Sequence, residues 1–199
     1  MFILGINGSA NSDGSTAYLL KEALTTARDY GAETELLHAA EILNDIDTPF
    51  CELCSASCEG SCGEGNKLGE AYELLRRADG VIIGSPVYFG TVSGQLKALW
   101  DKTRALRREK ALLNVVGGAV AVGGARFGGQ ETTIKAIHDM MMVQGMTIIG
   151  DGHQDADCGH QGVCAQRPAD KDENGKKRMK IMIQRLLQVA EATKELRAH

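Results

Sequence analysis

The feature that most constrains the fold of this 199-residue chain is an alternation of short apolar runs with longer amphipathic stretches. The apolar runs have the length of buried strands, and the amphipathic stretches repeat apolar residues at the spacing of a helix. Strands that are apolar throughout indicate a parallel sheet covered by helices on both faces. We therefore predict an α/β, doubly wound parallel sheet with five strands (2–7, 33–40, 80–85, 112–124 and 146–151) and five helices (15–31, 67–78, 93–106, 130–145 and 170–196).

Two parts of the chain depart from this pattern. A cysteine-rich insertion spans residues 49–65, and an irregular loop followed by the last helix makes up residues 151–199. Neither part has the composition of an interdomain linker, so we predict a single domain over residues 1–199. A chain of this length buries a sizeable core and does not need a disulfide framework for stability.

The charge pattern excludes several classes of function. The net charge is −4 and the acidic and basic residues are mixed, so there is no basic stripe for nucleic acid. The basic run "GKKRMK" at 175–180 is interpreted as a solvated helix face. No apolar run approaches the ~20 residues of a membrane span, and the first residues lack the basic start of a signal peptide. We expect a cytoplasmic protein that binds neither membrane nor nucleic acid.

Four thiols lie within twelve residues, in the stretch "CELCSASCEGSC". Disulfides are rare in reducing compartments, so this spacing favours a metal or cluster site. Structural zinc sites usually pair two short Cys motifs across a longer span, whereas one compact run is typical of cluster ligands. The residues leave open an iron–sulfur cluster, a zinc ion, and a loop of free redox thiols. The cysteines concerned are Cys51, Cys54, Cys58 and Cys62.

A second pair of thiols, Cys158 and Cys164, lies in "HQDADCGHQGVC" near His153 and His160. The spacing resembles that of metal ligands only weakly. We interpret these two residues as free or buried thiols of a loop.

Three loops that follow predicted strands have unusual compositions, and the carboxyl ends of parallel strands meet at one edge of the sheet. The first loop (7–16) offers hydroxyls and backbone N–H groups at a helix start, which suit an anion, although it matches neither common nucleotide-binding motif. The second (84–94) presents flat aromatic surface for a planar ligand. The third (123–131) combines four glycines with Arg126, which suits an anionic or electron-rich ligand. Each loop taken alone is also compatible with an ordinary connection.

Three longer stretches carry a resemblance to a known family. "GINGSANSDGSTAYLL", "GSPVYFGTVSGQLKALWDK" and "GGARFGGQETTIKAIHDMMMVQGM" resemble the NADPH-dependent FMN reductase family over roughly residues 1–150. The cysteine insertion after the second strand resembles that of the iron–sulfur flavoproteins within it. The resemblance implies a flavodoxin-like fold that binds FMN, and association into dimers or tetramers.

The resemblance also implies site residues. By this resemblance the FMN phosphate would lie on Ser9, Asn11, Ser15 and Thr16. The isoalloxazine ring would lie against Pro86, Val87, Tyr88, Phe89 and Gly90. The third loop would bring Gly124, Arg126 and Gly129 near the ring. Two features depart from the family. Ala10 and Asn11 stand where a Pro-Arg pair is frequent, so a cation for the phosphate is missing. The cysteine spacing has three residues between the second and third cysteines, where two are usual.

We therefore expect an FMN-dependent oxidoreductase or electron-transfer flavoprotein. The four clustered cysteines would ligate an Fe–S cluster, [4Fe–4S] in the first instance, and electrons would pass between NAD(P)H or a ferredoxin-like donor and an acceptor that the sequence does not identify. The alternative is a non-catalytic, zinc-binding module with a flavodoxin fold. No catalytic side-chain constellation is evident, so the chemistry would belong to the cofactors.

Overall fold

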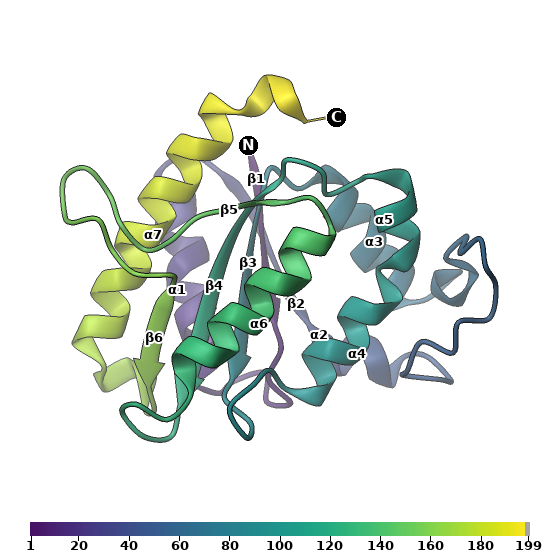
Figure 1. Cartoon of the computed structure of the whole chain (residues 1–199), viewed down its shortest axis with the longest axis horizontal. Coiled ribbons are helices and arrows are strands. Elements are labelled where there is room, and N and C mark those ends of the chain that lie inside the picture. The colour runs from purple at the N-terminus through teal and green to yellow at the C-terminus, as the bar shows by residue number, and fades with distance from the viewer. Residues whose placement is uncertain (198–199) are drawn as a thin grey trace.

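The computed structural model describes residues 1–197 and has a parallel sheet at its centre (Figure 1). The strand order is β2-β1-β3-β4-β5, and every pairing along it is parallel. The order confirms the predicted doubly wound α/β fold, in which the chain reverses its direction of progress across the sheet beside β1. The strands are β1 (Phe2–Asn7), β2 (Glu33–His38), β3 (Gly80–Pro86), β4 (Val116–Gly123) and β5 (Thr147–Ile148).

The fifth position of the sheet is divided between two strands. β5 pairs with the start of β4, and β6 (Val163–Gln166) pairs in parallel with the end of β4. Between them the chain leaves the sheet and returns at Gly162, where a Cβ would lie 2.6 Å from the Ala119 carbonyl oxygen of β4. The predicted fifth strand (146–151) is therefore shorter than expected, and β6 lies in a stretch predicted to be irregular.

The helices cover both faces of the sheet, as expected. Two of them, α1 (Ser15–Asp29) and α7 (Glu173–Ala192), pack in one apolar cluster, and the others pack in the second. The second group comprises α2 (Ala39–Asn44), α3 (Lys67–Arg77), α4 (Gly94–Lys102), α5 (Arg104–Glu109) and α6 (Gln130–Val143), and short 3₁₀ turns occur at Ser61–Gly63, Ala169–Lys171 and Lys194–Leu196. Two predictions differ here, because α2 begins where a strand was expected to continue and the helix predicted at 93–106 is broken at Thr103.

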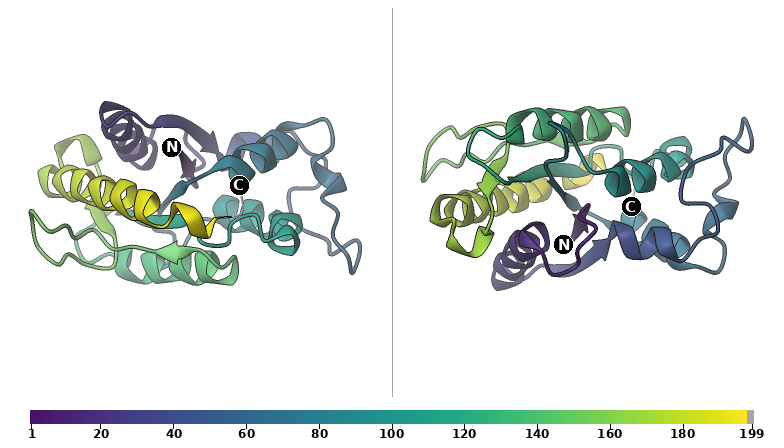
Figure 2. Two further views of the ribbon diagram at one scale, coloured as in Figure 1. Left: turned by 90° about the horizontal axis from the view of Figure 1, so that it is seen from above. Right: turned by 90° about the horizontal axis from the view of Figure 1, so that it is seen from below.

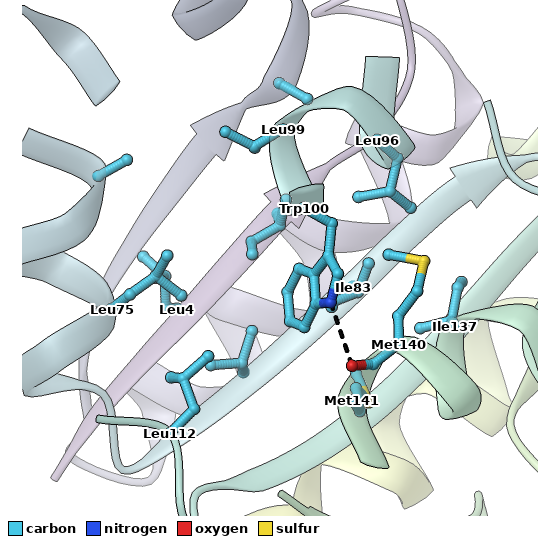
Figure 3. Packing of buried hydrophobic residues seen from close by; sticks show 14 of the residues in the cluster. Leu4, Leu75, Ile83, Leu96, Leu99, Trp100, Leu112, Ile137, Met140 and Met141 are labelled. Carbon is cyan, nitrogen blue, oxygen red and sulfur yellow. Dashed lines mark hydrogen bonds between the residues drawn. The ribbon is translucent and has the colours of Figure 1, made fainter. Parts of the chain in front are cut away.

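The larger core lies between β1, β3 and the helices of the second group. Trp100 of α4 is buried in it, and its indole N–H donates a hydrogen bond to the carbonyl oxygen of Met140 at 3.1 Å (Figure 3). This bond joins α4 to α6. It therefore helps to fix the relative positions of the loops that precede these two helices. Among residues 1–197 no helix combines the length and apolar character needed to cross a membrane.

A buried ion pair holds the 149–162 connection to α7. Arg178 is only 7% exposed and Asp151 only 1%. The Arg178 Nε donates to Asp151 Oδ2 at 2.7 Å. Arg178 also donates to both carboxylate oxygens of Asp157 at 2.9 Å. The run 175–180 is thus not a uniformly solvated face, as interpreted from the sequence, because one of its cations is an internal anchor.

We expect Arg178→Met to lower the free energy of unfolding by about 3–5 kcal/mol, because Asp151 would remain buried without its counter-charge. Arg76→Met is the matched control. Arg76 pairs with Glu109 at 2.8 Å on the surface, and such pairs contribute about 0–1 kcal/mol. Urea unfolding of both variants measures the difference, and equal losses would contradict the role of Arg178.

Candidate cofactor site at the carboxyl edge of the sheet

The first and second loops are joined where β1 and β3 end. The Gly8 N–H donates to the Gly84 carbonyl oxygen at 2.8 Å. The Ser93 hydroxyl donates to the Gly8 carbonyl oxygen, and the Ser93 hydroxyl oxygen caps α4 by accepting from the Leu96 N–H. A Cβ at Gly8 would lie 2.7 Å from the Cβ of Leu96. Only glycine therefore permits the two loops to approach this closely.

The first loop is shaped by a relay of short side-chain contacts. Asn7 accepts from the Ser9 N–H, Ser9 from the Asn11 N–H, and Asn11 from the Asp13 N–H, over distances of 2.9–3.1 Å. The loop ends at Gly14, which precedes α1 without any side-chain cap. The first backbone N–H groups of α1 are thus left for a ligand, and helix starts of this kind attract anions.

The second and third loops also touch. The Thr132 hydroxyl lies 2.7 Å from the Gly90 carbonyl oxygen and 2.9 Å from that of Gly129. Gly129 has a φ of +98°, and a Cβ there would stand 3.0 Å from the Gly90 Cα. The three loops therefore form one continuous rim at the carboxyl edge of the sheet, as expected.

Aromatic side chains project from this rim into solvent. Phe89 and Phe127 have positive φ values of 50° and 60°, and both are almost fully exposed; Tyr88 is partly exposed. Bulky residues seldom adopt this conformation, and strained backbone concentrates at functional sites. The guanidinium of Arg126 lies 5.2 Å from the Phe127 ring centroid. Flat apolar surface and a cation thus stand side by side, an arrangement that suits a planar, electron-rich ligand.

A fourth segment, residues 166–169, reaches the same rim. The Arg167 N–H donates to the Gly123 carbonyl at 2.9 Å, and the Ala169 N–H donates to the Ser15 hydroxyl oxygen at 3.2 Å. A Cβ on Gly124 would lie 3.4 Å from Arg167 Nε. This segment therefore links the first loop to the third. No local sequence pattern predicts this segment's place, because its position depends on the pairing of β6 with β4.

The structure places all twelve residues predicted to contact FMN on this rim or directly beneath it. Ser9 and Asn11 belong to the first loop, and Ser15 is the first residue of α1. Thr16, the next residue, is buried. Its methyl group packs so closely against β3 that a Cβ on Gly84 would lie 2.9 Å from it. The second and third loops carry the remaining predicted residues: Pro86, Val87, Tyr88, Phe89, Gly90, Gly124, Arg126 and Gly129. Their contacts with a flavin remain predictions.

The cysteine-rich segment forms an open loop between α2 and α3, at the far side of the molecule from α7 (Figures 1 and 2). Tyr72 of α3 lies beneath it. The Tyr72 hydroxyl donates to the Lys102 carbonyl at 2.5 Å and lies 3.9 Å from Cys62 Sγ. Burial is the largest cause that raises the pKa of Tyr72, followed by Cys62, with smaller contributions from Cys58 and Cys51. Of the four thiols, Cys62 is the one in contact with the phenol group.

Two arginines of α5 hold the backbone of this loop. Arg104 donates to the carbonyl oxygens of Ser55 and Ala56 at 2.9 and 3.0 Å, and Arg108 donates to that of Cys58 at 3.4 Å. The loop therefore carries two guanidinium groups along its inner side. These cations would offset the negative charge of thiolates or of a cluster held by them.

The six cysteines are all free thiols. Within residues 1–197 no three Cys, His, Asp or Glu side chains converge closely enough to hold a metal ion. The donor set nevertheless fits a thiolate-bound metal, because four free thiols, Cys51, Cys54, Cys58 and Cys62, lie on one loop. Cys158 is exposed, and burial raises the pKa of Cys164 to about 11. This second pair has the properties of unligated thiols.

Comparison with known proteins finds relatives that match most of the chain. The family model of NADPH-dependent FMN reductases matches residues 1–160. An iron–sulfur flavoprotein of Methanocaldococcus jannaschii is 43% identical over 82% of this chain and 83% of its own. Another, from Methanosarcina thermophila, is 38% identical over 96% of both chains. A flavodoxin, WrbA-like protein from Agrobacterium tumefaciens superimposes with a TM-score of 0.67 over 96% and 97% of the two chains, at 17% identity.

The position of Tyr72 predicts a dependence of stability on pH. The phenol of an unfolded chain loses its proton near pH ~10, whereas the raised pKa keeps it protonated in the folded protein. This contribution to stability is complete below that pH and is lost as the pH rises above it. In Tyr72→Phe the alkaline loss should be smaller, although its stability at neutral pH should be about 1 kcal/mol lower. Unfolding curves under reducing conditions between pH ~8 and ~11 measure both effects, and parallel losses in the two proteins would contradict this placement.

Proposed function

The chain belongs to the NADPH-dependent FMN reductase family, and from that premise we propose that it is an FMN-dependent oxidoreductase with its flavin across the joined loops of the carboxyl edge. The observation that carries the proposal is the direct bonding of these loops, Gly8 to Gly84 and Thr132 to Gly90 and Gly129. A ligand bound there would meet the three sets of candidate contacts at once.

Different residues of the rim would contact different parts of FMN. The hydroxyls of Ser9, Ser15 and Thr16 and the uncapped start of α1 would receive the phosphate. The segment from Pro86 to Gly90 and the glycines of the third loop would receive the ring, since glycine lets the backbone approach it closely. When bound, FMN accepts two electrons as a hydride and releases them singly. The protein supplies position, electrostatics and exclusion of water.

Arg167 would supply the cation that the first loop lacks. The family's frequent Pro-Arg pair is replaced here by Ala10 and Asn11. Arg167 directly follows β6, and Ala169, two residues further on, donates its N–H to the Ser15 hydroxyl at the proposed phosphate site. Its guanidinium has no ion-pair partner among residues 1–197. A guanidinium in this place suits the doubly charged phosphate of FMN.

Arg167→Ala should weaken FMN binding to the deflavinated protein about tenfold, the effect of one charge-assisted hydrogen bond, and should leave riboflavin binding unchanged. Flavin fluorescence quenching measures both affinities. Arg28→Ala, at the far end of α1, is the control and should alter neither. Equal weakening of FMN and riboflavin would place Arg167 at the ring rather than the phosphate, and a wild-type protein that binds no FMN would refute the function itself.

For the cysteine loop we propose an Fe–S cluster, [4Fe–4S] in type, ligated by Cys51, Cys54, Cys58 and Cys62. The support is the name of the two curated relatives, both iron–sulfur flavoproteins, the free state of the thiols, and the guanidinium groups of α5 on the loop. The protein would pass electrons between NAD(P)H or a ferredoxin-like donor and an acceptor of its own. A cluster carries electrons one at a time, which complements a flavin.

Cys58→Ser should remove most of the iron and sulfide of protein purified without oxygen while its FMN content stays at the wild-type level, because the thiol is not part of the rim. Cys158→Ser is the matched control and should keep its iron, since Cys158 lies outside the cysteine loop. Iron, zinc and sulfide assays beside the visible spectrum provide the measurement. About one zinc per chain without sulfide would instead support the zinc-binding alternative.

A further inference from the structure

One arginine binds two successive peptide groups of the cysteine loop. Arg104 of α5 donates to the carbonyl oxygens of Ser55 and Ala56 at 2.9 and 3.0 Å. Both residues belong to the spacer 55–57, between the second and third cysteines of the loop. A guanidinium carries its N–H donors in a fixed planar fork, which the single ammonium group of a lysine does not offer. Arg104 therefore fixes the orientation of two neighbouring peptide groups.

Two backbone N–H groups of the spacer face the other way. In a planar trans peptide the N–H is antiparallel to the C=O, and the spacer contains no cis bond. The N–H groups of Ala56 and Ser57 therefore point away from the Arg104 guanidinium. Neither of them donates a hydrogen bond within the described part of the chain. Neighbouring N–H groups that face one way form anion-binding concavities, which occur at many Fe–S sites.

Arg104 also brings a positive charge to the loop. Among residues 1–197, neither Arg104 nor Arg108 forms an ion pair. Arg108 donates to the Cys58 carbonyl oxygen at 3.4 Å, so both cations lie against the same loop. Reduction adds an electron to a cluster, and a nearby cation stabilises the more negative, reduced form. Both side chains should therefore raise the reduction potential of a cluster held here.

We propose that Arg104 is a positioning residue for the cluster. By holding the Ser55 and Ala56 carbonyls, it turns the N–H groups of Ala56 and Ser57 toward the cluster's sulfur atoms, and it thereby raises the reduction potential. The inference rests on the proposed function, because it presumes an Fe–S cluster on the four thiols of the loop. Hydrogen bonds to sulfur and net charge are among the properties that set the potential of such clusters. Arg104 acts through the backbone that it binds and is not itself a ligand.

The test is a redox titration of the cluster, followed by its EPR signal, in the full-length, FMN-loaded protein purified without oxygen. In Arg104→Gln the equilibrium constant for reduction should fall about tenfold, the effect of one hydrogen bond to a charged group. This corresponds to a midpoint potential lower by about 59 mV for one electron. Arg107→Gln is the matched control, because it removes the same charge from the same helix while Arg107 Nε donates to the Val143 carbonyl oxygen at 2.9 Å instead of to the loop. Its potential should equal that of wild type.

Arg104→Lys separates orientation from charge, because lysine keeps the charge without the planar fork. Its potential should lie between those of wild type and Arg104→Gln. A second measurement uses ¹⁵N-alanine, since Ala56 is the only alanine of residues 41–70. Pulsed EPR of the reduced wild-type cluster should detect coupling to the label. The coupling should weaken in Arg104→Lys and disappear in Ala56→Ser, which keeps the backbone N–H but carries no label.

Two results would overturn the inference while the cluster is present: equal potentials in Arg104→Gln and Arg107→Gln, or a wild-type cluster without coupling to Ala56. A wild-type potential in Arg104→Lys would overturn the positioning role, because charge alone would then account for the shift. Wild-type protein without iron and sulfide would refute the proposed cluster and the inference together. Iron, sulfide and FMN assays of each sample therefore separate a failure of the inference from a failure of the proposed function.

Discussion

The hydrogen bond from the Gly8 N–H to the Gly84 carbonyl is the contact on which the rest of the site depends. It brings the ends of β1 and β3 together at a point where a Cβ would collide with α4. Ser93 then joins the start of α4 to Gly8 by a hydrogen bond, and Thr132 of α6 is hydrogen-bonded to Gly90 of the second loop. The rim is therefore built on backbone groups and small residues, which leaves its larger side chains free for ligands.

α4 connects the two proposed redox sites. It is capped by Ser93, within the rim, and ends at Lys102, whose carbonyl accepts from Tyr72 beneath the cysteine loop. Its nine residues span about 13 Å at the rise of an α-helix. Trp100 holds it against α6, which starts at the third loop. One rigid element thus sets the position of the cysteine loop relative to the flavin site.

Much of the fold could be predicted from the sequence because β1, β3 and β4 are apolar throughout and α1 and α3 show clear helical periodicity. The loops of the rim were evident from their glycines and hydroxyls. β6 was not, since four residues that pair only with a distant strand carry little local signal. For the same reason Arg178 and Arg167 could not be placed: each acquires its role from contacts across the fold.

Hydrogen exchange of the protein with and without FMN tests the central claim most directly, since it reports where the flavin lies on the chain. The account predicts slower exchange on FMN binding in residues 8–16, 87–92, 124–129 and 166–169. Exchange in residues 51–62 should not change. Protection that fell outside these four segments, or that was confined to the cysteine loop, would contradict the placement of the flavin on the rim.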